Sequence, residues 1–247
     1  MQGVSRRDVL SADERTRAEQ IPLADDRTRF VVTRKGLRDV LRRYLGSPAA
    51  VAFAYGPYGK PMLAPTVPQR LEFNVSHAEG LALVAVSLEM PVGVDVEPVR
   101  PLDDLADLAE QVFSPAERAA WDRLPESERL AGFFEAWTRK EAVLKGLGDG
   151  LSRPLREVEV FGRRDADLWW DPTVPNSAWR LTSFAPQRGY VACVAAKVAD
   201  AGKTVKLTGF DFGLEVTACS FSGNRRGSAG LDAEALERLR TYLAGDL

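Results

Sequence analysis

Hydrophobic residues recur at steps of three and four positions through several stretches of the chain, which is the spacing of one face of a helix. This spacing predicts five helices, over residues 10–20, 25–45, 103–111, 114–124 and 126–147. Ser11 and Glu14 have the order of a capping box at the start of the first helix. Glycines between positions 146 and 150 are expected to end the longest helix, because glycine adopts the left-handed conformation that closes helices.

Shorter segments rich in β-branched and aromatic residues predict strands. They cover residues 51–55, 72–76, 81–87, 92–97, 156–161, 178–185 and 190–198. Residues 203–221 are expected to form one more hairpin, and residues 231–243 a short amphipathic helix that follows a polar, glycine-rich loop. Strands and a long helix in each part of the chain predict an α+β fold built from two similar halves.

The candidate boundary between the halves is the segment 98–101, which begins and ends with proline. We therefore expect an N-terminal half over residues 1–101 and a C-terminal half over residues 102–198. Residues 199–247 form a C-terminal extension that matches no motif, and its role is unknown.

The composition of the 247 residues is that of an ordinary globular protein, with 45 % hydrophobic and 28 % charged residues. A formal net charge of −2 gives no electrostatic footprint for duplex nucleic acid. No stretch reaches the roughly 18 apolar residues of a membrane span, and the N-terminus has no apolar signal core. Cys193 and Cys219 lack CxxC spacing and fit buried thiols in a reducing compartment. We expect a cytoplasmic protein without nucleic-acid or membrane partners.

Three carboxylates interrupt this apolar pattern. Asp95 and Glu97 alternate with valines, so they share one face of an extended strand, roughly 7 Å apart. Glu141 falls inside the apolar stripe of the longest helix. An ionised carboxylate buried without compensation costs several kcal/mol. We therefore hypothesise that the three converge on a divalent cation, and Mg²⁺ is the ion that best suits oxygen ligands.

Each of these residues also has an ordinary structural explanation. Asp95 and Glu97 fit the solvent face of an edge strand, and Glu141 fits an ion pair with Lys145 one helical turn later. His77 is the only histidine in the sequence, and a solitary histidine is more often a structural hydrogen-bonding residue than a catalyst. Taken singly, these residues favour the structural explanation.

Four motifs in a fixed order decide between the two interpretations. They are Phe73-Asn74-Val75-Ser76-His77, Val92-Gly93-Val94-Asp95-Val96-Glu97, Phe113-Ser114-Pro115-Ala116-Glu117-Arg118 and Trp137-Thr138-Arg139-Lys140-Glu141-Ala142. In this order and spacing, over about residues 13–198, the chain resembles the surfactin-type 4′-phosphopantetheinyl transferases. A single one of these motifs would be weak evidence.

The resemblance implies both a fold and an activity. The fold is a pair of α+β halves related by a pseudo-two-fold, each a small antiparallel sheet packed on a long helix. The activity is the Mg²⁺-dependent transfer of the phosphopantetheine arm of coenzyme A to a serine of an apo acyl, peptidyl or aryl carrier protein, with release of adenosine 3′,5′-bisphosphate. Such a chain is expected to be a monomer, because one chain contains both halves. The alternatives are a catalytically idle carrier-protein or nucleotide-binding module on the same fold, and a different Mg²⁺ enzyme, for which no nucleophile or glycine-loop motif is present.

The resemblance also implies roles for single residues. Asp95, Glu97 and Glu141 would hold Mg²⁺, and Glu141 would also accept the proton of the serine, directly or through a water. The coenzyme A contacts would come from basic and polar residues: Ser76 and His77 at the phosphates, Lys145 and Lys140 at the pyrophosphate, Lys60 beside the adenine and Arg29 at the 3′-phosphate. For Arg29 a solvated arginine face is an equally good explanation. The segment 113–118 is where carrier proteins dock in the family, although helix capping alone explains its sequence.

Overall fold

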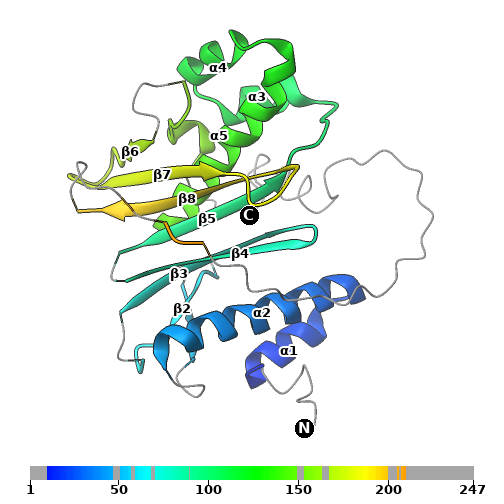
Figure 1. The fold of residues 1–247 in the computed structure, drawn as a ribbon, viewed down its shortest axis with the longest axis vertical. Helices are drawn as coiled ribbons and strands as arrows, with labels where there is room; N and C mark the ends of the chain where they lie inside the picture. The colour runs from blue at the N-terminus through cyan, green and yellow to red at the C-terminus, as the bar shows by residue number, and fades with distance from the viewer. Residues whose placement is uncertain are drawn as a thin grey trace. The chain divides into compact units, whose positions relative to one another are not determined.

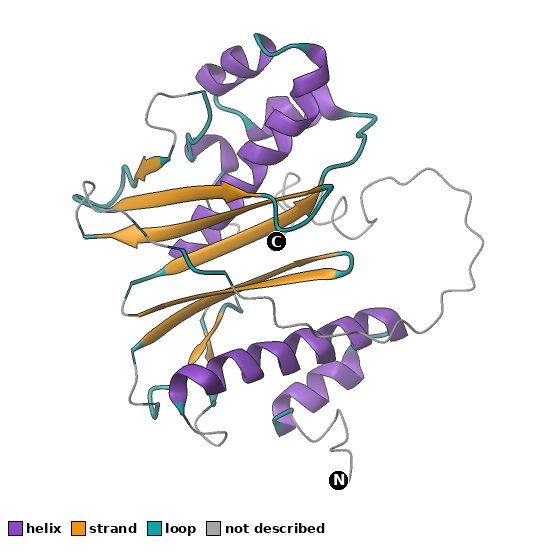
Figure 2. Ribbon diagram, in the orientation of Figure 1, coloured by secondary structure: helices purple, strands orange, loops and turns teal. Residues whose placement is uncertain are grey.

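The structure is a computed structural model, which describes residues 10–46, 51–56, 59–67, 70–88, 90–148, 153–162, 167–199, 205 and 207–209. It divides into two compact units (Figures 1 and 2). The first contains the described residues up to Ala52 together with those of 64–69 and 208–209. The second contains the remaining described residues, and with them nearly all of the motif positions.

The first unit is a pair of helices, α1 (Ala12–Gln20) and α2 (Ala24–Leu45). The predicted capping box is confirmed, because the Ser11 N–H donates to Glu14 Oε2 at 2.9 Å. The same Glu14 oxygen accepts from the Nε of Arg38 at 2.9 Å, and both side chains are buried. A charge-assisted bond between two helices is stronger than a neutral one, so this pair fixes α1 on α2.

The second unit contains three antiparallel sheets. Their strands are β1 (Phe53–Tyr55), β2 (Pro61–Leu63), β3 (Leu71–Ala78), β4 (Leu81–Leu88), β5 (Val92–Pro98), β6 (Leu168–Trp170), β7 (Ala178–Phe184) and β8 (Tyr190–Val198). β1 pairs with β2, β3 pairs with β4, and the largest sheet has the order β5-β8-β7-β6. The helices of this unit are α3 (Leu105–Val112), α4 (Pro115–Asp122) and α5 (Glu126–Leu147), with a 3-10 turn at Leu155–Glu157.

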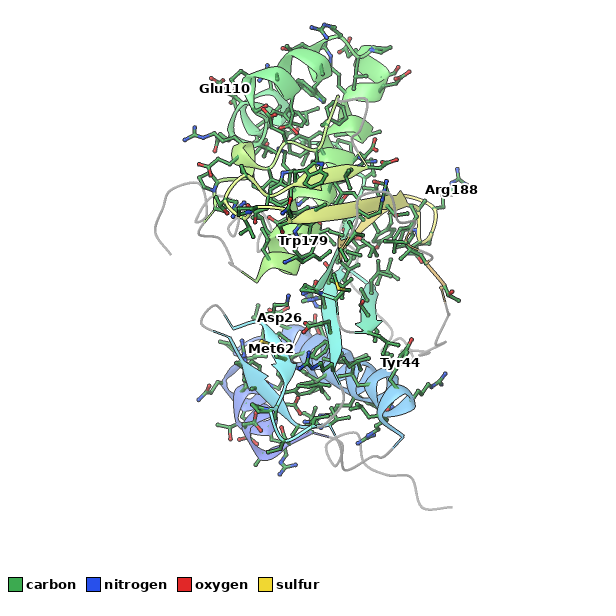
Figure 3. The ribbon with its side chains drawn as sticks, turned by 90° about the vertical axis from the view of Figure 1, so that its left-hand side faces the viewer. Asp26, Tyr44, Met62, Glu110, Trp179 and Arg188 are labelled. Atoms are coloured by element: carbon green, nitrogen blue, oxygen red, sulfur yellow. The ribbon has the colours of Figure 1, made fainter. Side chains whose placement is uncertain are left out.

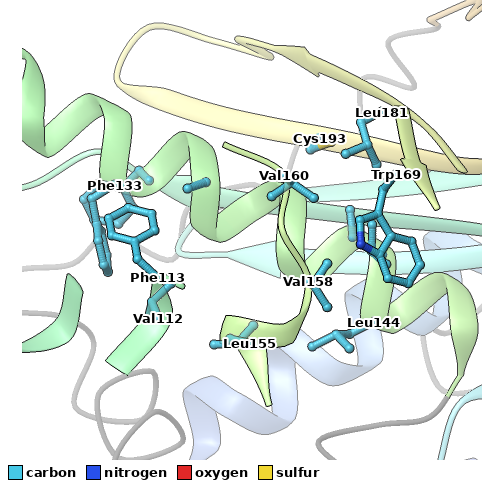
Figure 4. Close-up of a cluster of buried hydrophobic side chains, with 14 of the residues drawn as sticks. Val112, Phe113, Phe133, Leu144, Leu155, Val158, Val160, Trp169, Leu181 and Cys193 are labelled. Atoms are coloured by element: carbon cyan, nitrogen blue, oxygen red, sulfur yellow. The ribbon is translucent and has the colours of Figure 1, made fainter. Parts of the chain in front are cut away.

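The core of the second unit lies between α5 and the four-stranded sheet (Figure 4). Aromatic side chains dominate the part of this core that α3 and α4 cover, where the Phe113 ring lies 5.8 Å from that of Trp121 and 6.0 Å from that of Phe133, centroid to centroid. Large rings bury much apolar surface and add edge-to-face attraction, so they hold α3, α4 and α5 together. This core fixes the position of α5 on β5.

The β3–β4 pair lies beside β5 (Figure 1). The two sheets are separate, and a side chain joins them: Asn74 Oδ1 accepts from the Val94 N–H at 3.0 Å. Leu83 and Ala85 of β4 pack on the valines of β5. The face of β5 that carries its valines is thus covered by β4. Ser76 of β3 reaches the other face, which carries Asp95.

The α+β class and all five predicted helices are confirmed, and residues 126–147 match α5 at both ends. The short strands β2 and β6 were not predicted. The predicted strand over 156–161 is wrong. Its backbone bonds to a buried ion pair instead: Glu117 Oε1 accepts from the N–H groups of Val160 and Phe161, and Lys140 donates to the carbonyl of Val158.

The predicted boundary at residue 101 does not separate compact units. β5 from the predicted first half pairs with β8 from the second, in register from Val92 with Ala196 to Pro98 with Tyr190. The two halves therefore share one sheet, and the pseudo-two-fold between them stays a prediction. The predicted elements at 203–221 and 231–243 lie outside the described residues, apart from positions 205 and 207–209. Within the part of the chain that the structure describes, no helix has the length and apolar character needed to cross a membrane.

Candidate functional site

Two glycines let β5 and α5 approach each other closely. A Cβ atom on Gly93 would lie 1.9 Å from the Ala142 carbonyl oxygen and 2.4 Å from the Gly146 nitrogen. A Cβ on Gly146 would lie 2.5 Å from the ring of Trp179, which reaches this point from β7 (Figure 3). Only glycine tolerates such an approach of backbone to backbone. Residues on the same face of β5 as Gly93 therefore meet the last turns of α5.

Asp95, Lys145 and Ser76 form a compact group at this contact. Lys145 Nζ lies 2.5 Å from Asp95 Oδ1 and donates to Ser76 Oγ at 3.1 Å. The Ser76 hydroxyl donates to the same Asp95 oxygen at 2.9 Å. Burial alone would lower the pKa of Lys145, but the carboxylates of Asp95 and Glu141 outweigh it and raise that pKa above its usual value. The lysine is therefore held firmly in its charged form.

Glu97 and Glu141 belong to the same electrostatic neighbourhood. The pKa of Glu97 is raised to about 8, chiefly by burial, then by the negative charge of Asp95, with a smaller contribution from Glu141. Lys145 and Arg100 oppose this shift without cancelling it. The three predicted carboxylates thus lie close enough to repel one another, as the metal hypothesis requires.

The second carboxylate oxygen of Asp95, Oδ2, is buried and has no hydrogen-bond partner. A buried acceptor without a partner costs free energy, and such atoms are rare in folded proteins. The unused oxygen and the raised pKa of Glu97 both indicate more negative charge than the neighbouring cations balance. An oxygen-binding divalent ion fits this set of donors. Among the described residues, no three such side chains are already arranged as a metal site, so the convergence of Asp95, Glu97 and Glu141 on one ion stays a prediction.

The raised pKa of Glu97 predicts a pH dependence of stability. The folded chain keeps this proton up to about pH 8, whereas an ordinary glutamate releases it near 4.5. Between these values the folded state binds more protons, so without divalent ions the melting temperature should fall as the pH rises. Glu97→Gln should flatten this part of the profile. A fall of equal size in Glu97→Gln would assign the dependence to another group.

Lys140 does not lie with these residues in the structure, and its contact with pyrophosphate stays a prediction. Its side chain is fully buried on the other side of α5, where Nζ contacts Glu117 Oε2 at 2.6 Å. It also donates to the carbonyls of Leu155 at 3.0 Å and Val158 at 2.6 Å, which uses all three ammonium protons. Glu117 is also part of the capping box of α4 with Ser114. The 113–118 motif thus has a structural role, and its use in docking stays a prediction.

Ser76 and His77 were predicted to bind phosphate together, but the structure separates them. Successive residues of a strand point to opposite faces, and here Ser76 is buried against Asp95 whereas His77 is exposed. Ser76 therefore positions Asp95 and Lys145 in this structure. His77 remains accessible to a ligand, and its contact with coenzyme A stays a prediction.

The two remaining predicted contacts lie at different places. Lys60 Nζ donates to the Gly146 carbonyl at 3.0 Å, at the C-terminal end of α5, where a cation suits the helix dipole. It is thus within the second unit, close to the residues that carry Lys145. Arg29 lies on α2 in the first unit and pairs with Asp26 at 2.8 Å. Its role at the 3′-phosphate stays a prediction.

The sequence interpretation missed Arg100. This arginine is buried, pairs with Glu79 at 3.2 Å and contributes positive charge at Glu97. A basic residue three positions after Glu97 has no distinctive spacing, so only the fold reveals it. The sequence interpretation also missed that Gly93 and Gly146 allow β5 and α5 to pack closely. Nothing in the sequence around either glycine indicates that the two elements are in contact.

Comparison with known proteins agrees with this geometry. Residues 91–195, which run from β5 to β8, match the family model of the 4′-phosphopantetheinyl transferase superfamily. The chain is 38 % identical over 194 residues to the 4′-phosphopantetheinyl transferase HetI of Nostoc sp., which covers 76 % of this chain and 78 % of that protein. It is 30 % identical over 161 residues to a 4′-phosphopantetheinyl transferase of Bacillus subtilis, covering 65 % and 70 % of the two chains. It is 24 % identical over 203 residues to the 4′-phosphopantetheinyl transferase Sfp of Bacillus subtilis, covering 82 % and 88 %. With these extents of similarity, the chain belongs to the 4′-phosphopantetheinyl transferase superfamily.

Proposed function

We propose that this chain transfers the 4′-phosphopantetheine group of coenzyme A to a serine hydroxyl of an apo carrier protein. Family membership makes the chain a transferase. The observation that carries the proposal is the group formed by Asp95, Ser76 and Lys145, with Glu97 and Glu141 in the same electrostatic neighbourhood. All of these side chains come from one chain, so this group needs no second copy.

In the proposed reaction, the serine oxygen forms a bond to the phosphorus that carries the pantetheine arm. The bond from that phosphorus to the bridging oxygen breaks, and adenosine 3′,5′-bisphosphate leaves with the electron pair. Lys145 supplies positive charge at the pyrophosphate, since lysine is a compact cation suited to phosphate oxygens. Glu141 takes the serine proton through a water, because a carboxylate that also binds metal cannot fully serve as a direct base.

Asp95, Glu97 and Glu141 are the residues that would hold Mg²⁺. A bound Mg²⁺ would neutralise the charge that develops on the phosphoryl oxygens. The unused Oδ2 atom of Asp95 and the excess of negative charge around Glu97 support this assignment. The protein's own contribution is then to hold charged groups in place before the reaction, which is the main source of catalysis in phosphoryl transfer.

The test is to incubate the protein with coenzyme A, Mg²⁺ and an apo carrier protein, and to weigh the carrier by mass spectrometry. We expect one carrier class, acyl, peptidyl or aryl, to gain the mass of one phosphopantetheine group, and a chelator to prevent the gain. An idle binding module would bind coenzyme A and leave every carrier unchanged. That outcome with all three classes would overturn the proposal.

A further inference from the structure

We infer that Lys145 and a divalent cation compete for Asp95, so that cation binding releases Lys145 from the acidic group towards a phosphate ligand. The inference rests on the proposed function, because it concerns the same site. It gives Lys145 two successive partners, a carboxylate of the protein and an oxygen of a diphosphate ester. Cation affinity and diphosphate affinity would then be coupled through one side chain.

The contacts of Asp95 carry the first step. Its Oδ1 atom is occupied by the ammonium of Lys145 at 2.5 Å and the hydroxyl of Ser76 at 2.9 Å. Its Oδ2 atom is buried and has no partner. A divalent cation on Oδ2 would lie within a few ångströms of the ammonium group. Because like charges repel strongly at such short range in a buried place, the cation and the lysine cannot both be held well.

Exposure decides which of the two partners moves. The Asp95 side chain is only 3 % exposed and is fixed on β5, whereas the Lys145 side chain is 33 % exposed. Lysine carries its charge on a flexible four-carbon stem, so it can leave the carboxylate without any change in the backbone. The Ser76 hydroxyl keeps its bond to Asp95 Oδ1 when the lysine leaves.

The charges around Lys145 indicate which ligand its ammonium group can contact after it leaves Asp95. Glu141 lies one helical turn before it, and Glu97 adds negative charge nearby, so the free ammonium remains in an acidic region. A diphosphate ester that binds there offers anionic oxygens in place of Asp95. By linkage, a ligand that draws Lys145 away from Asp95 must raise cation affinity by the same factor as the cation raises affinity for the ligand.

The experiment measures the affinity for Mg²⁺ alone, without coenzyme A, by titration calorimetry. Lys145→Met removes the competing charge and keeps the length of the side chain, so Mg²⁺ should bind about tenfold more tightly than to the unmodified chain. The matched control is Lys35→Met, which removes a lysine of similar exposure from a partly exposed ion pair with Asp39, also 2.5 Å long. The control should bind Mg²⁺ as the unmodified chain does. Equal or weaker binding by Lys145→Met would overturn the inference.

A second measurement uses the unmodified chain and decides the question even if Lys145→Met does not fold. Amine-specific labelling read by mass spectrometry should modify Lys145 several times faster with saturating Mg²⁺ than without it, while the rate at Lys35 stays constant. An unchanged rate at Lys145 would overturn the inference. Neither measurement involves a carrier protein, so a failure of the transfer reaction and a failure of this competition are distinguishable.

Discussion

Asp95→Ala is expected to reduce transfer to the carrier protein by about 10³-fold or more while the chain remains folded. Asp95 holds Lys145 and Ser76 on one oxygen and leaves its other oxygen for a cation. In the proposed mechanism, its loss would therefore remove a metal ligand and the anchor of the lysine that binds phosphate together. The measurement is the rate at which the carrier gains mass, at saturating coenzyme A and Mg²⁺.

The fold should survive this change for two reasons. Removing the Asp95 charge lessens the repulsion that raises the pKa of Glu97, and the freed Lys145 can extend towards solvent. Thermal unfolding checks this expectation, and Asp95→Asn offers an isosteric variant that keeps a partner for Ser76. Asp39→Ala, which breaks a partly exposed ion pair with Lys35, is the matched control and should transfer at the normal rate. Retained activity in a folded Asp95→Ala would refute the role of Asp95 in the site.

The sequence predicted the elements that carry this site because their signals are local. The spacing of apolar residues indicated α5 from its first residue to its last, and alternation indicated β5 with both carboxylates on one face. The partner of Lys145 could not be found in this way. Glu141, one turn away, is the local partner that the sequence offers, and its charge does raise the pKa of Lys145, but the structure also joins Lys145 to Asp95, which lies 50 positions away.

Long-range pairs of this kind depend on how closely two elements approach. The glycines between positions 146 and 150 were expected to end the longest helix, and α5 does end there, at Leu147, with Gly148 after it at a φ of 78°; Gly146 itself lies within the helix. The role of Gly146 is instead to admit Gly93 and the ring of Trp179. No pattern within a single element reports such a contact.

Two pairs of neighbouring motif residues are separated in the structure for the same physical reason. Lys140 and Glu141 are neighbours in a motif, yet adjacent residues of a helix point about 100° apart, so they face different sides of α5. Ser76 and His77 are neighbours in a strand and point to opposite faces. Assigning both members of each pair to the same site ignored these directions, and the buried member of each pair has a partner within the protein.

Lys140→Met is expected to lower the free energy of unfolding by about 3–5 kcal/mol, because it leaves the Glu117 carboxylate buried without its cation. Lys140 and Glu117 are 0 % and 1 % exposed, so water cannot replace the lost partner. Glu117 also accepts from the backbone N–H groups of Val160 and Phe161, so the damage should spread to the segment after α5. Chemical denaturation of both chains measures the difference.

The double variant Lys140→Met with Glu117→Gln separates the ion pair from the packing around it. Removing both charges should cost less than the sum of the two single changes, since no charge is then left buried alone. Lys35→Met, in a partly exposed pair, should cost at most about 1 kcal/mol. A role at the pyrophosphate would give the opposite result for Lys140→Met: unchanged stability, with a higher KM for coenzyme A or a lower turnover. The balance between lost stability and lost activity therefore decides whether this lysine holds α5 in place or binds the substrate.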